Sequence, residues 1–528
     1  MNDTDLPEES AAIYKCKIVK KQALGYFLYQ VCIKQQSTKP DTAIDMELTF
    51  LTAKAILFNL GAEKSRTFVL DLKNIIQGAA RSQISSSIVQ ECSLLEESES
   101  CMLVPLNNPA IFPGYSSTPI VLTNPEKFSE FLIQTEKMIG TINSDTSFSG
   151  IQIALINSPP GSSVFVFVES PANDQEKMKE IEYLVYERKT SLSFVVTVDV
   201  LHSAAPYGFQ AYEHIAQLSG GQMLFVEREA LGAIMPIVWS LTEVTMRLKE
   251  IGRHIRRDCS IAERHEVTLF YAAQSSGNAT FAFYVDNLVD NVIILVSSSS
   301  EITDFRLSDP NGRNQTKIPE NGRLATIQTT QFLIAARLTL PITTGLWEIW
   351  ISAVGNYTVA VRGQSTLDFQ YQLSILDNET HPGLIHLDRR PVADIPAILF
   401  VSVVGLLGNS SLLFDQVSLK GTDGKNLQDL QLQPASHTGE FLTEMTSLPK
   451  QPFYVALHGK DGHIIFDRVL PRLNSVSDVL VQAEDAGQLY PNQHYNLTFQ
   501  ITNFGKSRQF TVNAINDKGF AQTLNISR

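Results

Sequence analysis

The runs VFVFV at residues 164–168 and LSFVVTV at residues 192–198 decide the fold of this chain. Both are short, continuous and rich in β-branched and aromatic residues, which is typical of strands buried on both faces. Between them, Asn173 to Lys189 is polar, with apolar residues at helical spacing and acidic residues near its start, as expected at a helix N-terminus. Strand, helix and strand in this order predict a right-handed parallel crossover.

The neighbouring sequence extends this unit into a doubly wound α/β domain, which we place at residues 51–258. Its further predicted elements are the strands Thr67–Asp71, Met102–Leu106 and Met223–Val226, the helices Gly150–Asn157 and Tyr212–Ser219, and the polar loop Ser144–Ser149. The pair Gly220-Gly221 is expected to end the second of these helices. In such a fold, ligands bind at the carboxyl ends of the strands.

From about residue 262 the pattern changes to all-β. Short strands recur at roughly ten-residue spacing, separated by turn sequences such as Asp309-Pro310-Asn311-Gly312, and this is typical of β-sandwiches. The fold class is therefore α/β plus all-β in several domains. Besides the α/β domain we expect a remnant of an upstream region at 1–50, β-sandwiches at 262–367 and 368–474, and a partial immunoglobulin-like domain at 475–528.

Composition and charge exclude some functions. The net charge of −13 argues against nucleic acid as a partner, because phosphate binding needs a basic face. The longest apolar stretch, Ile395 to Gly408, is too short to span a bilayer and predicts a core strand. No apolar run near the N-terminus resembles a signal peptide.

Glycosylation sequons nevertheless favour a secretory route. Seven of the eight Asn-x-Ser/Thr triplets lie beyond residue 277, and the other is at Asn2. The seven are Asn278, Asn314, Asn356, Asn378, Asn409, Asn496 and Asn525. Such a density in one half predicts an extracellular, glycosylated protein. Since no signal peptide is present, we expect the sequence to be a fragment or to start from a misplaced initiation site.

The cysteines leave their pairing open. None has the spacing of zinc ligands. The five are Cys16, Cys32, Cys92, Cys101 and Cys259. Cys92 with Cys101, and Cys16 with Cys32, would close small loops, whereas the alternative is buried free thiols. The odd count leaves at least one cysteine unpaired.

Several short segments along the chain resemble a known family. They are Leu103–Pro109 (LVPLNNP), Pro160–Ser162, Tyr212–Ala216, Ser219–Gln222, Gly345–Ile349, Val361–Phe369, Arg390–Val392, Phe453–Asp461 and Phe466–Arg468. Their order resembles that in hemicentins and related von Willebrand factor A domain-containing proteins, over most of residues 55–528. The resemblance implies an A domain followed by a galactose-binding-like β-sandwich, a further β domain and immunoglobulin-like modules.

In that family, the A domain carries a metal-ion-dependent adhesion site. The resemblance implies an Asp-x-Ser/Thr-x-Ser motif after the first strand, a threonine in a later loop and an aspartate after the central strand. A hard cation such as Mg²⁺ prefers oxygen ligands in near-octahedral geometry, with one position left for a partner's carboxylate. Metal-dependent ligand binding is thus one possible function.

The residues at these positions predict a degenerate, metal-free site. Asp71 keeps the first carboxylate, but Lys73 and Ile75 stand where hydroxyls are required, and an ammonium group would repel the ion. Glu169 takes the second carboxylate position. Two candidates for the loop hydroxyl are Thr146 and Ser147, and a rival register uses Asn59, Gly61 and Glu63.

We therefore expect a non-enzymatic extracellular protein that mediates adhesion or matrix interaction, with no cofactor and with an extracellular or matrix protein as partner. One alternative is a Mg²⁺-dependent ligand-binding A domain. Another is a hydrolase in which Asp71 and Glu169 act as a catalytic pair. Trp347 and Trp350 are expected to point to one face of a strand, either as core residues or as a platform for stacking carbohydrate.

Overall fold

The computed structural model describes parts of the chain from residue 14 to residue 507. These are residues 14–15, 22–23, 26–27, 33–34, 64–71, 86–90, 92, 99–106, 147–198, 208–232, 235, 265–274, 276–318, 321–377, 383–387, 390–405, 412–435, 438–483 and 498–507. The first four pairs form the short strands β1 (Tyr14–Lys15), β2 (Gln22–Ala23), β3 (Tyr26–Phe27) and β4 (Ile33–Lys34). Within the described residues, no helix is long and apolar enough to cross a membrane.

The N-terminal half contains a five-stranded parallel sheet, as predicted. Its strands are β5 (Lys64–Asp71), β6 (Glu99–Leu106), β7 (Ser163–Val168), β8 (Ser191–Val198) and β9 (Met223–Glu227). Their order is β6-β5-β7-β8-β9, and every neighbouring pair is parallel. The direction of winding therefore reverses between β5 and β7, and the prediction of a doubly wound α/β domain is confirmed.

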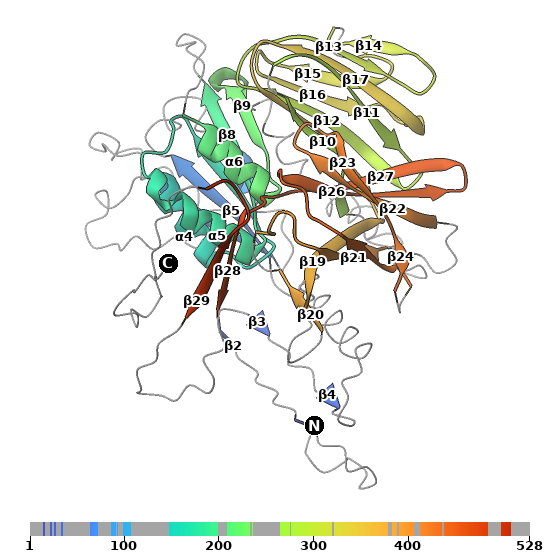
Figure 1. Cartoon of the computed structure of the whole chain (residues 1–528). Helices are drawn as coiled ribbons and strands as arrows, with labels where there is room; N and C mark the ends of the chain where they lie inside the picture. Colours follow the sequence, from blue (N-terminus) through green and yellow to red (C-terminus); the bar gives the residue numbers. More distant parts are fainter. Residues whose placement is uncertain are drawn as a thin grey trace, which may run out of the picture.

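Helices cover one face of this sheet (Figure 1). They are α4 (Ser147–Asn157), α5 (Met178–Arg188) and α6 (Gln210–Ser219), with the 3₁₀ turn η2 (Gln175–Lys177). The 3₁₀ turn η4 (Arg228–Ala230) follows β9, and its Ala230 packs against the apolar cluster on the other face. Gly220 ends α6 in the left-handed conformation, with φ of 78°. At Gly221, a Cβ atom would lie 1.8 Å from the carbonyl oxygen of Leu192, so only glycine lets α6 turn this closely onto β8.

The next domain is a β-sandwich. Its strands are β10 (His265–Gln274), β11 (Gly277–Val285), β12 (Val289–Ser298), β13 (Ile302–Ser308), β14 (Asn314–Thr316), β15 (Ala325–Thr329), β16 (Leu333–Leu338), β17 (Gly345–Ala353) and β18 (Tyr357–Ser365). A four-stranded sheet in the order β11-β17-β13-β14 packs against β15-β16-β12-β18-β10. Alternate residues such as Phe281, Phe283 and Trp347 point into the core between the sheets.

A second sandwich follows. Its strands are β19 (Asp368–Asp377), β20 (Gly383–His386), β21 (Ala397–Val404), β22 (Leu412–Gly421), β23 (Asn426–Gln431), β24 (Gln433–Pro434), β25 (Glu440–Met445), β26 (Phe453–Asp461) and β27 (Ile464–Asn474). The sheet β20-β19-β21-β25-β24 packs against β27-β26-β22-β23. After it, β28 (Val479–Ala483) and β29 (Phe499–Asn503) form an antiparallel pair.

The two sandwiches share one continuous sheet of nine strands, in the order β15-β16-β12-β18-β10-β27-β26-β22-β23. The joint is the pairing of β10 with β27 at Thr268 and Val469. Beside it, Arg468 forms an ion pair of 2.7 Å with Asp286, and each side chain is only 1% exposed. Arg468 also donates to the carbonyl of Leu367 and the hydroxyl of Ser365. The buried pair thus connects the two sandwiches at the segment that joins them.

The α/β domain packs against the opposite face of this long sheet. Leu224 of β9 belongs to the same apolar cluster as Leu295 of β12 and Leu333 of β16. At this contact, the backbone N–H of Phe225 donates to the Ser297 hydroxyl at 3.1 Å. The α/β domain therefore contacts the sandwiches through an edge strand of its own sheet.

The expectation that Trp347 and Trp350 share one face is wrong. Trp347 is buried in the sandwich core, whereas Trp350 lies on the outer face of β17, with the Arg306 guanidinium 5.3 Å from its ring centroid. Side chains alternate along a strand with a period of two, so residues three apart point to opposite faces. Trp347 is a core residue, and Trp350 is partly exposed to solvent.

Replacing Arg468 by Met is expected to lower the free energy of unfolding by about 3–5 kcal/mol, because it leaves the Asp286 carboxylate buried without a counter-charge. The double variant Arg468→Met, Asp286→Asn should recover much of this loss. As a control, Lys450→Met breaks an exposed pair with Asp394 and should cost less than about 0.5 kcal/mol. Urea denaturation of the four proteins measures these differences. Equal costs for the two single variants would contradict the assigned role.

Asp368, at the boundary between the sandwiches, should make stability depend on pH. Burial raises the pKa of Asp368 to about 6, although the backbone N–H of Phe369 and the charge of Arg468 lower it. The unfolded chain loses this proton nearer pH 4, so the carboxyl destabilises the fold as pH rises from about 4 to about 6. Asp368→Asn should therefore raise the free energy of unfolding by about 1–2 kcal/mol near pH 7 and change it little near pH 3.5. A gain of equal size at both pH values would refute this assignment.

Candidate functional site

The candidate site lies at the carboxyl edge of the parallel sheet, where the order of strands reverses. Leu70 of β5 is paired with Phe167 of β7, so β5 ends at Asp71 beside the end of β7, and Glu169 directly follows β7. This crevice is where doubly wound folds bind ligands. The sheet thus brings the backbones of the two candidate carboxylate residues to one edge. Lys73, Ile75, Thr146 and the rival positions Asn59, Gly61 and Glu63 lie outside the described residues.

The Glu169 carboxylate is paired with an arginine. Nη2 of Arg228, in η4 just after β9, lies 2.9 Å from both Oε1 and Oε2 of Glu169. The Glu169 side chain is 12% exposed, and that of Arg228 is 37% exposed. Such charge-assisted hydrogen bonds are about twice as strong as neutral ones. The guanidinium therefore places a positive charge beside the second candidate carboxylate at this edge.

Ser147, the described candidate for the loop hydroxyl, is also engaged. It begins α4 and is buried, and its hydroxyl is hydrogen-bonded to the Tyr212 hydroxyl of α6. Tyr212 in turn donates to the carbonyl of Ser170 at 3.3 Å, and its ring stacks on Phe194 with centroids 4.9 Å apart. The Ser147 hydroxyl therefore belongs to a buried network that fixes the segment after Glu169.

Asp174, like Arg228, is a residue of this edge that the sequence pattern does not identify. Its carboxylate accepts hydrogen bonds from the backbone N–H groups of Phe148 (3.0 Å) and Ser149 (2.7 Å), and from the Ser149 hydroxyl. It thereby caps α4 from 26 residues away. This explains why α4 begins at Ser147, within the segment predicted to be a polar loop. The sequence pattern places the acidic residues after β7 only at the start of the following helix.

A third polar cluster has the distances of a serine hydrolase triad. His458 Nε2 lies 2.7 Å from the Ser418 hydroxyl, and His458 Nδ1 lies 2.6 Å from the Asp467 carboxylate. However, the Ser418 hydroxyl is also hydrogen-bonded to the Asp429 carboxylate. Ser418 is also fully buried. The cluster therefore connects β22, β23, β26 and β27 without presenting a nucleophile to a substrate.

Among the described residues, no group of three or more His, Cys, Asp or Glu side chains is arranged to hold a metal ion. Cys92 forms a disulfide with Cys101 of β6, which decides that pairing. Cys16, Cys32 and Cys259 lie outside the described residues.

Three of the sequons fall in described parts of the chain. Asn278, Asn314 and Asn356 are all exposed to solvent, and all belong to the first β-sandwich. The remaining sequons beyond residue 277 lie outside the described residues. They are Asn378, Asn409, Asn496 and Asn525.

The fold thus defines a protein with a von Willebrand factor A-type domain followed by β-sandwiches, and comparison with known families agrees. Residues 67–228 match the von Willebrand factor A domain, and residues 266–366 match the hemicentin galactose-binding domain-like family. Residues 368–470 match the VWA7 beta-sandwich domain, and residues 478–528 match the VWA7 Ig-like domain. The chain has the VWA7/hemicentin-type domain architecture, and the resemblance seen in the sequence is confirmed.

Individual relatives are about one quarter identical to this chain over the aligned residues. von Willebrand factor A domain-containing protein 7 of Rattus norvegicus is 26% identical over 506 residues, which cover 89% of this chain and 53% of that protein. Hemicentin-2 of Mus musculus is 25% identical over 398 residues, or 74% of this chain and 7% of that protein. The chain thus spans about half the length of the first relative. Among solved structures, proximal thread matrix protein 1 from the mussel byssus is similar with a TM-score of 0.26 and 9% identity. The match covers 33% of this chain and 47% of that chain.

Asp174→Ala is expected to lower the free energy of unfolding by about 1–2 kcal/mol, because the N-terminus of α4 loses its cap. Asp174→Asn should cost less, since the amide oxygen still accepts one hydrogen bond. Denaturation followed by circular dichroism measures both variants. Glu176→Ala, a change at an acidic residue of η2 that is exposed, is the matched control. If Asp174→Ala cost no more than this control, the capping assignment would be wrong.

Proposed function

We propose that this chain is a non-enzymatic extracellular protein for adhesion or matrix interaction, and that its A domain binds an acidic partner without a metal ion. The domain order supports this proposal, because A domains and β-sandwiches in the same order occur in hemicentins. The partner is inferred to present carboxylates, since the candidate site offers a cationic group. The guanidinium of Arg228 takes the role that the cation has in a metal-dependent A domain.

The observation that carries this proposal is the ion pair between Glu169 and Arg228. A divalent cation at this edge needs free carboxylate oxygens, but both oxygens of Glu169 accept hydrogen bonds from Arg228. Binding a cation would require breaking this pair and bringing two positive charges together. Lys73 and Ile75 have no hydroxyl groups to coordinate a cation. Few ligand bonds would therefore compensate for breaking the Glu169–Arg228 pair.

Two further features support the secretory route. The described sequons are exposed, as a glycan acceptor must be. The disulfide between Cys92 and Cys101 is of a kind that persists in oxidising compartments and is rare in the cytosol.

Hydrolase activity has less support. The carboxylate of Glu169 is neutralised by Arg228, and the triad-like cluster lacks an exposed nucleophile, because Ser418 is fully buried. Each arrangement therefore lacks a group that general acid–base or nucleophilic catalysis requires.

Calorimetric titration of the purified chain with Mg²⁺ and with Mn²⁺ is expected to show no stoichiometric binding. The reason is that one carboxylate is already paired and two hydroxyl ligands are missing. Tight one-to-one binding of either ion that Asp71→Ala or Glu169→Ala abolishes would overturn the prediction of a metal-free site. Retention of the chain on decellularised extracellular matrix should likewise be unchanged by EDTA.

In the same retention assay, Arg228→Ala should weaken binding to the matrix at least about tenfold, the change expected from losing about 1.4 kcal/mol of charge-assisted contact. Glu229→Ala, at the adjacent and exposed residue of η4, is the matched control and should bind as the unmodified chain does. Binding that disappears in EDTA and returns with Mg²⁺ would support the metal-dependent alternative. No retention at all would refute the matrix interaction.

A further inference from the structure

The four-stranded sheet of the first sandwich has a sequon on each of its two edge strands. Its order is β11-β17-β13-β14, so β11 and β14 are outermost. Asn278 lies in β11 and Asn314 in β14, whereas the inner strands β13 and β17 contain no sequon. Edge strands carry unpaired backbone groups that can pair with another chain. The two acceptor asparagines therefore occupy the two places where this sheet could be extended.

On β11, the open part of the edge is the end that carries Asn278. The other end of the strand leads into Asp286, whose carboxylate is held by Arg468 of β27, so the second sandwich lies beside it. Asn278 is exposed, and Phe281 and Phe283 on the opposite side of the strand point into the core. The alternation of side chains thus directs Asn278 away from the core, at the end remote from the joint.

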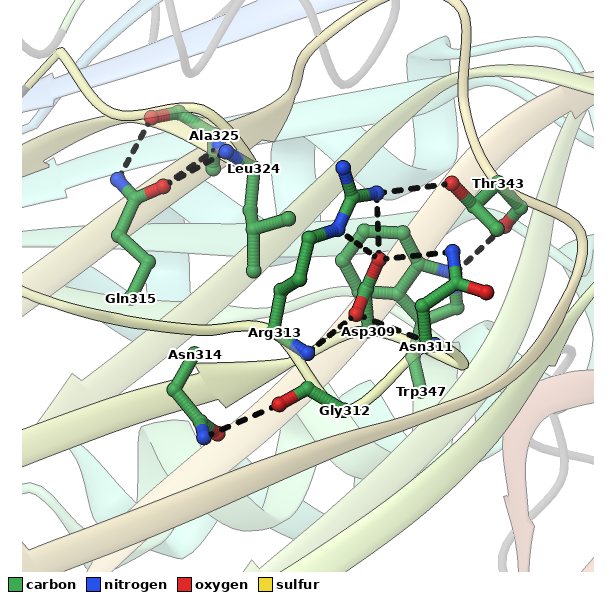
Figure 2. Close-up of polar contacts among 10 residues, drawn as sticks. All are labelled: Asp309, Asn311, Gly312, Arg313, Asn314, Gln315, Leu324, Ala325, Thr343 and Trp347. Atoms are coloured by element: carbon green, nitrogen blue, oxygen red, sulfur yellow. Dashed lines mark hydrogen bonds and ion pairs between the residues drawn. The ribbon is translucent and has the colours of Figure 1, made fainter.

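On β14, buried contacts fix the direction of Asn314 (Figure 2). The neighbouring Gln315 is buried and donates to the carbonyl of Ala325 at 2.7 Å. Its side-chain oxygen accepts the backbone N–H groups of Leu324 (2.9 Å) and Ala325 (3.0 Å). Because Gln315 points inward, Asn314 and Thr316 on either side of it point outward, and both are exposed.

The turn that leads into β14 is equally well fixed. The Asp309 carboxylate accepts the backbone N–H groups of Asn311 and Arg313, and forms an ion pair of 2.6 Å with the Arg313 guanidinium. Burial alone would raise the pKa of Asp309, but these hydrogen bonds and the charge of Arg313 lower it below its ordinary value. Figure 2 shows this cluster next to Asn314, whose Nδ2 donates to the Gly312 carbonyl at 3.3 Å. Asn314 is thus presented on a rigid support.

Between the two sequons, the outer face of the sheet is partly apolar. Thr280, Trp350, Arg306 and Thr316 form one row across the four strands. Leu346 of β17 is 40% exposed on the same face. This face combines Trp350 and Leu346 with polar residues, and it lies between two strands that have no further partner in this sheet among the described residues. Such edge strands can pair with those of a second copy of the chain.

We propose that N-linked glycans on Asn278 and Asn314 block the two edges of this sheet and so prevent edge-to-edge association of the chain. The proposal rests on the secretory route proposed above. The donor is an oligosaccharide linked to a lipid pyrophosphate: the bond from C1 of the sugar to the pyrophosphate oxygen breaks, and the bond from C1 to Nδ2 forms. One Nδ2 hydrogen leaves as a proton, and the lipid pyrophosphate departs with the electron pair. The remaining N–H of Asn314 can still donate to Gly312.

Asn356 provides an internal control. It is an exposed sequon residue of the same domain, but it lies in the turn between β17 and β18 and not on an edge strand. Its carbonyl accepts the backbone N–H of Ser299, so the turn is fixed independently of its side chain. A glycan at Asn356 is not expected to affect pairing of the sheet.

The test uses the full chain, secreted from animal cells behind an added signal peptide. Glycopeptide mapping first establishes whether Asn278 and Asn314 are modified. Sedimentation velocity then compares the unmodified chain with Asn278→Gln, Asn314→Gln, their double variant and Asn356→Gln. The double variant should self-associate at least about tenfold more tightly, whereas Asn356→Gln should not. Circular dichroism and thermal melting identify any variant that fails to fold.

Two further measurements test whether self-association occurs through the edge strands. Enzymatic deglycosylation of the folded, unmodified chain should produce the same self-association without any substitution. Adding Ala282→Lys, on the exposed side of β11, to the double variant should weaken the association through β11 and leave that through β14, because a lysine on an edge strand opposes pairing.

Each remaining outcome counts against the proposal in a distinguishable way. Glycans at Asn278 and Asn314 whose removal leaves the chain monomeric would refute the inference but leave the extracellular function standing. Glycans at Asn356 without any at Asn278 and Asn314 would do the same. A secreted chain with no glycan at any sequon would remove this inference together with its support from the secretory route.

Discussion

One antiparallel sheet of nine strands is the constraint to which the other parts of the structure conform. The four-stranded and five-stranded sheets cover one of its faces and form the two sandwich cores. The α/β domain lies against the other face, through β9 at one end and α6 near β27 (Figure 1). Continuity of this sheet depends on the short pairing of β10 with β27. The buried ion pair of Arg468 and Asp286 holds that junction, and removing one partner would leave a charge with no water to solvate it.

The α/β domain and the sandwiches contact each other at two places. The sandwiches contact β9 along its edge, and the Glu182 carboxylate of α5 bridges His214 and Arg390 on the side of the helices. Burial alone would raise the pKa of Glu182, but the hydrogen bond from His214 and the charge of Arg390 lower it. The domain contacts are thus carried by residues other than Glu169 and Arg228.

The sequence revealed the strands and helices well because their signals are local. The buried runs at 164–168 and 192–198 became β7 and β8, and Gly220 ended α6 as the pattern predicts. What could not be read were partnerships across long separations. Asp174 caps a helix that precedes it, Arg228 reaches back 59 residues to Glu169, and Arg468 reaches back 182 residues to Asp286. The position of a single arginine or aspartate in a sequence does not indicate which distant residue it pairs with.

The proposed replacement of a metal ion by an arginine is physically consistent with the other residues at the site. A divalent cation offers two charges and needs several oxygen ligands, and the side chains of Lys73 and Ile75 supply none. A guanidinium offers one charge with directional donors, and it needs only one carboxylate to orient it. Glutamate is longer than aspartate and reaches from the end of β7 to η4, where Arg228 lies. In the proposed function, the longer carboxylate, the absent hydroxyls and the arginine belong together, because Arg228 would then supply the positive charge that a cation supplies in a metal-dependent A domain.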